Sequence, residues 1–327
     1  MGDKDLSDLT NNVQLVRAYK TYILKAAQLL CDQDQGHDPL HHDGCNTSII
    51  NSNIEEIIQL ESLLANIRLP IEDLRDPEHT YNKLTLDELH IKTQFDWLNK
   101  IFLPIWKMLN VTVSIDGRTK VIVSDINYLV KAVSILSKTT PRVIENYFGW
   151  HVVDQYGSVA SELFRNLVFE FNKIRLGVAK PTERWQNCLN LANDNLPWAI
   201  SRLYVDNYFT KQEKQAAASL IDEVQQAFIR LIKENSWLDP VTKKASINKL
   251  KHVTKNVAYP DWLLDNSELD RYHGLENKTF VKELLEENNY ALSLIRFIAN
   301  YVQKVYNGLD KPIDIDKKYC KIDRRAN

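Results

Sequence analysis

The regular helical spacing of apolar residues most strongly constrains how this chain of 327 residues can fold. Apolar side chains recur every three or four positions over residues 5–31, 211–236 and 291–305, which places them on one face of a helix. In the middle segment they are Leu220, Ile221, Val224, Ala227, Phe228, Leu231 and Ile232. Only 9 glycines are present, roughly half of the usual share, so few tight turns are expected. The sequence therefore predicts a mainly α fold, a multi-helix domain with long helices.

Local signals predict where several of these helices begin and end. Thr210 with Glu213, and Thr85 with Glu88, have the spacing of a capping box. Proline and glycine mark further boundaries at Thr140-Pro141, Gly177, Pro197, Asp239-Pro240 and Gly308. We therefore expect one helix from Pro141 toward Gly177, and another from Asp239-Pro240 to about residue 254.

One strand pair is predicted, between residues 111–115 and 121–123, joined across Asp116-Gly117 as a small β-hairpin. The predicted loops are residues 32–52, 70–82 and 256–278. No internal repeat or low-complexity linker interrupts the pattern. We expect one helical domain over residues 1–315, followed by a divergent tail over residues 316–327.

The overall composition excludes several classes of protein. Lys and Arg number 41 and Asp and Glu 43, a formal charge of −2, and no basic stripe indicates binding to nucleic acid. No apolar run is long enough to span a bilayer. The N-terminus opens into an amphipathic pattern without the form of a secretion signal, so we expect no export route or membrane segment in this chain.

A short segment concentrates side chains that can bind metals. It contains Cys31, His37, His41, His42 and Cys45. Thiolates and imidazoles at this density can bind zinc or copper, but no Cys-x-x-Cys pair is present and the spacing fits no zinc finger. The alternative is a polar loop closed by a Cys31–Cys45 disulfide.

Three N-glycosylation sequons begin at Asn46, Asn110 and Asn277. Such triplets arise often by chance, so by themselves they are weak indicators of a secreted protein.

The sequence contains no recognisable catalytic motif. None of the eight histidines is followed by glutamate, so the His-Glu-x-x-His pattern of zinc peptidases is absent. Gly-x-Ser-x-Gly and phosphate-binding glycine patterns are absent as well. We therefore assign no catalytic residue, no metal ligand and no cofactor within this chain.

Several aromatic residues have patterns typical of a structural role. Trp150, Trp185, Trp198, Trp237 and Trp262 are predicted to pack as core anchors between helices. His151 is predicted to be a hydrogen-bonded structural residue. After the loop Tyr259-Pro260-Asp261, we expect Trp262-Leu263-Leu264 to return into the core.

A series of ordered blocks connects the chain to a known family. The blocks are Tyr81-Asn82-Lys83-Leu84-Thr85-Leu86, Asp96-Trp97-Leu98, Asn146-Tyr147-Phe148-Gly149-Trp150, Arg184-Trp185-Gln186-Asn187-Cys188, Ser201-Arg202-Leu203-Tyr204-Val205, Trp237-Leu238-Asp239 and Tyr259-Pro260-Asp261. In this order they resemble the neprilysin and endothelin-converting enzyme family of zinc metalloendopeptidases, from about residue 10 to residue 312.

The resemblance implies a helical region that faces a zinc-bearing domain across an enclosed cavity and limits access to small peptides. It covers the family's non-catalytic part, so no zinc or catalytic residue carries over to any position here. The family's zinc motifs are expected after Lys311-Pro312, where this sequence diverges. Members are membrane-anchored or secreted, which implies an extracellular location. The resemblance also pairs Cys188 with a cysteine outside this chain, and relatives carry a sequon at the position of Asn110.

Three hypotheses follow for the function. The first is the cavity-shaping region of a neprilysin-like peptidase, inactive alone, with the missing zinc-bearing domain or a full-length relative as partner. The second is a stand-alone, non-catalytic protein that binds peptides or proteins. The third is a metal-binding helical protein that uses residues 31–45. Under the first, the face that meets the zinc-bearing domain is expected to expose apolar surface.

Overall fold

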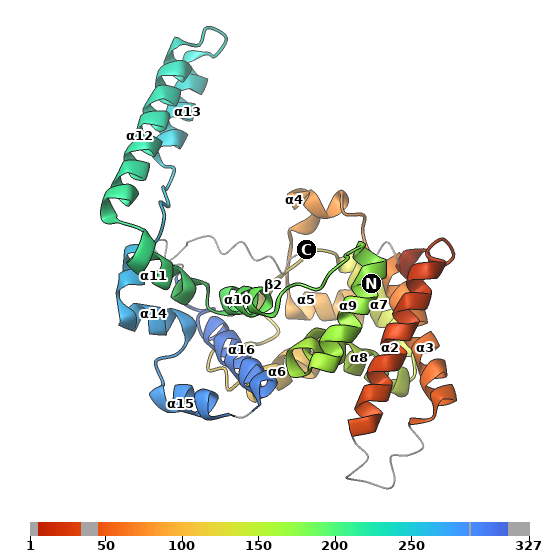
Figure 1. Ribbon diagram of the computed structural model, residues 1–327. Helices are drawn as coiled ribbons and strands as arrows, with labels where there is room; N and C mark the ends of the chain where they lie inside the picture. Colours follow the sequence, from red (N-terminus) through yellow and green to blue (C-terminus); the bar gives the residue numbers. More distant parts are fainter. Residues whose placement is uncertain (1–5, 34–44, 288, 313–327) are drawn as a thin grey trace. The chain divides into compact units, whose positions relative to one another are not determined.

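The computed structural model describes residues 6–33, 45–287 and 289–312 (Figure 1). Of these described residues 73% are helical, and they contain one two-stranded antiparallel sheet, which confirms the predicted mainly α class. Contacts divide it into two compact units, residues 1–181 with 284–309 and residues 182–283 with 310–327. The single domain over residues 1–315 stays a prediction.

The first unit is built around four packed helices. These are α2 (Val13–Gln33), α3 (Thr47–Asn66), α8 (Pro141–Ala160) and α9 (Glu162–Leu176). The other elements of the unit are η2 (Asp73–Arg75), α4 (Pro77–Thr80), β1 (Asn82–Thr85), α5 (Leu86–Thr93), η3 (Leu98–Phe102), α6 (Leu103–Met108), β2 (Lys120–Val123), α7 (Ile126–Lys138) and α16 (Tyr290–Tyr306). Helix α16 also contacts α8.

The core of the first unit is rich in aromatic rings. Tyr22 stacks on Phe171 with ring centroids 5.2 Å apart, and meets Trp150 edge-on at 5.0 Å. Isoleucines of α3 complete the same buried cluster, among them Ile54, Ile57 and Ile58. Offset and edge-to-face ring pairs add to the gain from apolar burial, so this cluster holds α2, α3, α8 and α9 together.

The sheet differs from the predicted hairpin. Strand β2 covers residues 120–123, but its partner is β1, with Asn82 opposite Val123 and Thr85 opposite Lys120. The prediction that residues 111–115 form the other strand is wrong. The backbone there bonds elsewhere, because the Val113 carbonyl accepts from the Trp106 indole at 2.9 Å and the Thr112 amide donates to Asn307 Oδ1 at 2.7 Å.

The helix expected from Pro141 toward Gly177 is two helices. Ser161 has extended backbone angles and ends α8, and its side chain then accepts from the Leu163 amide to cap α9. Gly177 is left-handed at φ 68° and ends α9, as glycine allows without a steric cost.

The second unit contains α10 (Arg184–Asn195), α11 (Pro197–Tyr208), α12 (Lys211–Glu234), α13 (Pro240–Lys251), η4 (Asp261–Leu264) and α14 (Asn266–His273). Helix α15 (Lys278–Glu286) leads from this unit back to the first along the chain. The structure confirms the capping boxes at Thr210 and Thr85, and the helix start after Asp239.

The predicted loops contain regular structure. Helix α3 begins at Thr47, within the segment 32–52, and Asn46 caps it by accepting from the Ser48 amide. Helix α4 lies within 70–82 and α14 within 256–278. The polar caps of these helices resemble turn residues in sequence, and α4 and α14 are also short, with 4 and 8 residues, so the sequence alone favours loops there.

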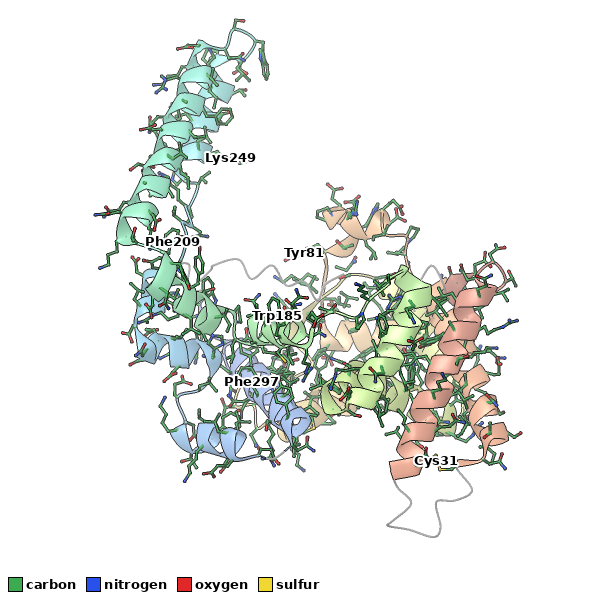
Figure 2. All side chains as sticks on the ribbon, in the orientation of Figure 1. Cys31, Tyr81, Trp185, Phe209, Lys249 and Phe297 are labelled. Carbon is green, nitrogen blue, oxygen red and sulfur yellow. A yellow bond between two sulfur atoms is a disulfide. The ribbon has the colours of Figure 1, made fainter. Side chains whose placement is uncertain are left out.

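The tryptophans divide into two groups. Trp150 is buried, and Trp198, Trp262 and Tyr272 form an aromatic cluster with Trp262 stacked on Tyr272 at 5.0 Å. The expectation of core anchors is wrong for Trp237 and for Trp185 (labelled in Figure 2), which are 80% and 63% exposed. Trp185 lies in the first turn of α10 and Trp237 in the connection between α12 and α13, where periodicity does not determine burial.

Candidate functional site

A buried group of polar side chains joins three helices of the first unit. The Trp150 indole Nε1 donates to the Tyr19 hydroxyl at 2.7 Å, and this hydroxyl donates to Glu61 Oε1 at 2.9 Å. His151 Nε2 lies 3.5 Å from the same carboxylate oxygen. We call these four residues the Glu61 cluster. They come from α2, α3 and α8, so the cluster depends on how those helices pack.

Burial sets the electrostatics of the Glu61 cluster. Desolvation raises the pKa of Glu61 from 4.5 to about 7, although the hydrogen bond from Tyr19 acts in the opposite direction. Burial also raises the pKa of Tyr19, and it lowers the pKa of His151. Glu61 Oε2 is buried without a hydrogen-bond partner among the described residues. In all three residues burial disfavours the charged form of the side chain, because that form loses its contact with water.

The Glu61 cluster can hold helices together, but its geometry gives no sign of catalysis. Tyr19 and Glu61 are buried, so a substrate cannot reach their oxygens. Only His151 is partly open, and its ring packs edge-on against Tyr147 at 4.5 Å. The hydrogen-bonded structural role predicted for His151 stays a prediction.

The sequence analysis missed Glu61, although α3 contains a signal for it. The buried face of this helix includes Ile54, Ile57, Ile58 and Leu64, and Glu61 occupies the same helical row. A carboxylate within an apolar stripe needs partners when the stripe is buried. The sequence alone does not identify Tyr19 and His151 as the partners of Glu61, because they lie 42 and 90 positions from it along the chain.

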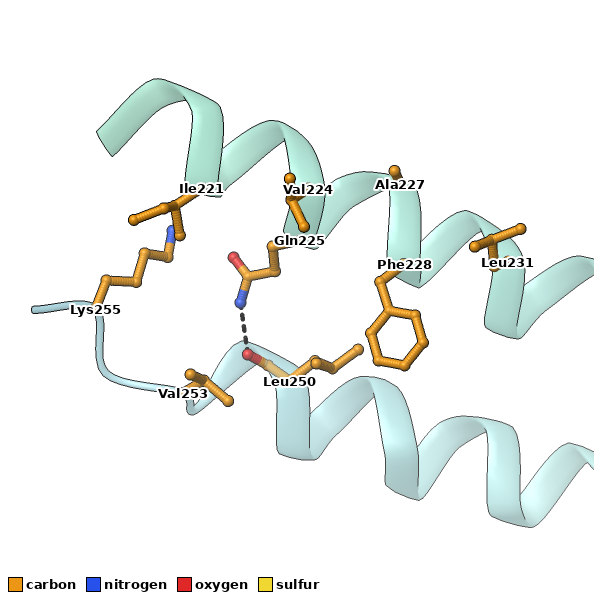
Figure 3. A pocket seen from close by; sticks show the side chains of 9 residues that line it. All are labelled: Ile221, Val224, Gln225, Ala227, Phe228, Leu231, Leu250, Val253 and Lys255. Atoms are coloured by element: carbon orange, nitrogen blue, oxygen red, sulfur yellow. Dashed lines mark hydrogen bonds between the residues drawn. The ribbon is translucent and has the colours of Figure 1, made fainter. Parts of the chain in front are cut away.

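The second unit contains an apolar groove between α12 and α13 (Figure 3). It has a volume of about 470 Å³. Its lining residues are Ile221, Val224, Gln225, Ala227, Phe228, Leu231, Leu250, Val253 and Lys255. The Gln225 amide donates to the Leu250 carbonyl at 2.6 Å, the hydrogen bond dashed in Figure 3. We call this feature the α12–α13 groove.

The groove exposes most of the apolar stripe that the sequence places on α12. Val224 is 61% exposed, Phe228 51% and Leu231 62%, whereas Ile229 and Ile232 are buried. Part of the apolar surface of α12 is therefore buried, and the part that lines the groove stays largely open. The family resemblance predicts exposed apolar surface on the face that meets the zinc-bearing domain, and that this groove belongs to that face stays a prediction.

The structure joins Cys31 and Cys45 in a disulfide, with their Cα atoms 5.8 Å apart. Cys188 is exposed and forms no disulfide within the described residues. The remaining members of the predicted metal cluster, His37, His41 and His42, lie outside the described residues. Over the described part of the chain, no three His, Cys, Asp or Glu side chains gather as a metal site requires.

The sequon asparagines are all exposed, and two of them cap helices. Asn46 caps α3, while Asn277 Oδ1 accepts from the Thr279 amide at the start of α15. The Asn110 carbonyl accepts from the Gln303 side chain at 3.2 Å, so α16 packs beside this sequon. Their glycosylation stays a prediction.

In the described ranges, no helix combines the length and apolar character required to cross a membrane.

Comparisons with known proteins agree with this fold. The model of peptidase family M13 matches residues 1–260. Neprilysin-1 of Trittame loki is 30% identical over 279 residues, which cover 84% of this chain and 37% of that protein. Endothelin-converting enzyme 1 of Cavia porcellus is 26% identical over 284 residues, 85% of this chain and 35% of that protein. The chain thus spans little more than a third of the length of these relatives.

A solved structure has a similar fold. The zinc metalloprotease Zmp1 of Mycobacterium tuberculosis in its open state superimposes with a TM-score of 0.72. The two are 20% identical, and the match covers 98% of this chain and 45% of that chain. The family match over residues 1–260 shows that the chain belongs to peptidase family M13, where it corresponds to the mostly helical N-terminal region.

Proposed function

We propose that this chain forms the helical, cavity-shaping region of a neprilysin-like zinc metalloendopeptidase, and that zinc and the catalytic groups come from a separate zinc-bearing part. The match of the M13 family model to residues 1–260 carries this proposal. The relatives are about two and a half to three times as long as the segment that this chain spans. A zinc-bearing domain, or a full-length relative, is the partner that the proposal requires.

The residues of this chain do not fit a peptidase zinc site. Such a site uses two histidines one helical turn apart with an adjacent glutamate as base, and no His-Glu-x-x-His occurs in the sequence. The described residues also bring together no metal-binding group. We therefore assign this chain no step in peptide hydrolysis, and its role is to form one wall around the substrate.

Two features support an extracellular location. A disulfide between Cys31 and Cys45 persists in oxidising compartments, and cytosolic proteins rarely keep one. The sequons at Asn46, Asn110 and Asn277 lie on exposed side chains, where an oligosaccharide transferase has access. We propose that the protein acts outside the cell, as a secreted or membrane-anchored ectodomain.

A second candidate function is a stand-alone, non-catalytic protein that binds peptides or proteins. The observation in its favour is the α12–α13 groove, whose apolar lining is open on α12. Such a protein would bind its ligand without a zinc-bearing part.

A chimaera tests the proposed function. Residues 10–312 would replace the matching region of Neprilysin-1 of Trittame loki, and cleavage of a series of peptides of increasing length would be measured. We expect chelator-sensitive cleavage with a changed upper limit on peptide length, because the helical region shapes the cavity. The matched control is the unmodified relative.

This chain alone, with and without added zinc, is the second control. Chelator-sensitive cleavage by the chain alone would contradict the proposal. A folded chimaera that cleaves nothing, together with tight peptide binding by the chain alone, would favour the second candidate.

A further inference from the structure

The start of α3 combines a glycosylation sequon with a disulfide. Cys45 is bonded to Cys31 in the last turn of α2, and Asn46 follows Cys45 directly. Asn46 begins the sequon Asn46-Thr47-Ser48, and α3 starts at Thr47. The asparagine that would receive a glycan therefore lies between a covalent link to one helix and the first turn of another.

The side chain of Asn46 is exposed, but its triplet is held in a fixed conformation. Asn46 Oδ1 accepts from the Ser48 amide at 2.8 Å, and the Asn46 carbonyl accepts from the Ile50 amide at 3.0 Å. An oligosaccharide transferase recognises the asparagine together with the hydroxyl two positions later. Transfer to Asn46 therefore requires the first turn of α3 to open, so that the triplet can leave these hydrogen bonds.

The sequon at Asn277 has the same local restraint without a bridge. Asn277 Oδ1 accepts from the Thr279 amide at 3.0 Å and from the Phe280 amide at 3.2 Å, at the start of α15. The cysteines that flank it in the sequence, Cys188 and Cys320, are distant. A cap of this kind opens readily, because the first turn of a short helix is only marginally stable by itself. The two sites thus differ in the disulfide, which the opening of a helix end cannot break.

Disulfide formation and glycan transfer compete in time. Cys31 precedes Cys45 by 14 positions, which a ribosome adds in about 1–3 s at about 5–20 residues per second. The Cys31 thiol is therefore already outside the ribosome when the sequon emerges. Disulfide formation takes seconds or longer, so glycan transfer precedes the bridge in some chains and follows it in others.

We propose that the Cys31–Cys45 disulfide controls glycosylation at Asn46. Chains that close the bridge first keep Asn46 unmodified, and chains modified first carry a glycan there. Because α2 and α3 share the buried aromatic cluster of the first unit, the bridge holds the start of α3 against a packed helix. This inference rests on the proposed extracellular location, since a chain meets both reactions in the secretory pathway.

The two reactions use different atoms of neighbouring residues. In the first, the thiols of Cys31 and Cys45 lose two protons and two electrons to the disulfide of a thiol oxidoreductase, which becomes a dithiol. In the second, Asn46 Nδ2 bonds to the anomeric carbon of a lipid-linked oligosaccharide. The bond from that carbon to the lipid diphosphate breaks, and Nδ2 loses one proton. An exposed side chain leaves room for the glycan in the folded protein.

The modified fraction at each sequon tests this proposal. The full chain would be expressed in cultured animal cells behind an added secretion signal, and mass spectrometry after peptide N-glycosidase digestion would measure the fractions. Cys31→Ser removes the bridge but leaves Cys45 and the triplet unaltered. It should raise the modified fraction at Asn46 at least about twofold, because disulfide formation no longer competes, and should leave Asn277 unchanged. Cys188→Ser is the matched control, since Cys188 is exposed and unbridged within the described residues.

A second control separates the bridge from general stability. Ile58→Ala truncates a side chain of α3 that is 2% exposed, so it destabilises the helix packing while the bridge stays intact. It should leave the modified fraction at Asn46 unchanged. The proposal is overturned if Cys31→Ser does not alter that fraction, if it raises Asn277 equally, or if Ile58→Ala has the same effect. Because the added signal delivers every variant to both reactions, these outcomes concern the bridge alone, whereas the natural location of the chain is tested without that signal.

Discussion

Trp150 donates its indole hydrogen to the hydroxyl of Tyr19 at 2.7 Å, across 131 positions of the chain. The same hydroxyl donates to Glu61, which lies 42 positions from Tyr19. One phenol thus connects α2, α3 and α8 in the core of the first unit. Because all three side chains are buried, water cannot replace a missing member.

Tyr19→Phe should lower the free energy of unfolding by about 3 kcal/mol, because it leaves the Trp150 indole and the Glu61 carboxylate without this partner. Urea unfolding followed by circular dichroism measures the loss. Tyr22→Phe is the matched control. Tyr22 donates to Asp154 at 2.9 Å, and Asp154 is exposed to water, so this variant should lose only about 1 kcal/mol. Equal losses in the two variants would contradict the role assigned to Tyr19.

The stability of the first unit should depend on pH through Glu61. Its pKa in the folded state is about 7, above its ordinary value of 4.5, so the folded state holds this proton more tightly. The stabilisation is fully present below about pH 4.5 and is lost as the pH rises through about 7, a change of about 3 kcal/mol. Glu61→Gln cannot ionise, and it should remove this part of the decline.

Urea unfolding at several pH values between about 5 and about 8 provides the measurement. His151 contributes in the opposite direction, since burial lowers its pKa and its stabilisation is lost as the pH falls below its ordinary value of 6.5. Comparing Glu61→Gln with Glu55→Gln separates the two effects, because Glu55 is an exposed residue of the same helix paired with Lys20. The assignment fails if both variants keep the pH dependence of the unaltered chain.

The sequence predicted those features that depend on neighbouring residues. Thr210 and Glu213 lie three positions apart, and their reciprocal hydrogen bonds need only the first turn of α12. The strand over 121–123 was predicted from its own β-branched residues, and β2 covers 120–123. The partner strand β1 was not predicted. It is only four residues long, Asn82–Thr85, and it lies some forty positions before β2 in the sequence.

Periodicity also predicted the apolar stripe of α12, but not its exposure. A helical period identifies which face of a helix is apolar, whereas its covering depends on which element packs there. Ile229 and Ile232 are buried, whereas Phe228 of the same helix is half exposed. For the same reason the sequence could not predict the Glu61 cluster, whose members meet only when α2, α3 and α8 pack.

The Cys31–Cys45 disulfide should stabilise the packing of α2 against α3. It closes a loop with a sequence separation of 14, and the loss of such a constraint costs about 3 kcal/mol. The double variant Cys31→Ser with Cys45→Ser should therefore unfold at a lower urea concentration. Cys188→Ser is the control, because Cys188 is exposed and unbridged in the structure. An unchanged midpoint in the double variant would show that the bridge does not stabilise the fold.

Two adjacent leucines of η4 should differ in their contribution to the second unit. Leu263 is 0% exposed and its neighbour Leu264 is 37% exposed. The Leu263 carbonyl accepts from Arg202 of α11 at 3.0 Å, which fixes η4 against that helix. Leu263→Ala should lower the free energy of unfolding by about 3 kcal/mol, because the surrounding side chains cannot fill the space left behind.

Leu264→Ala should cost less than about 1 kcal/mol, since water already reaches this side chain. Both variants keep the backbone bond to Arg202, so the comparison isolates the side-chain burial. Thermal and urea unfolding of the pair, followed by circular dichroism, measures the difference. The core position expected for Leu264 is already wrong, since it is 37% exposed. Similar losses for the two leucines would mean that Leu263 is not packed into the second unit as the structure places it.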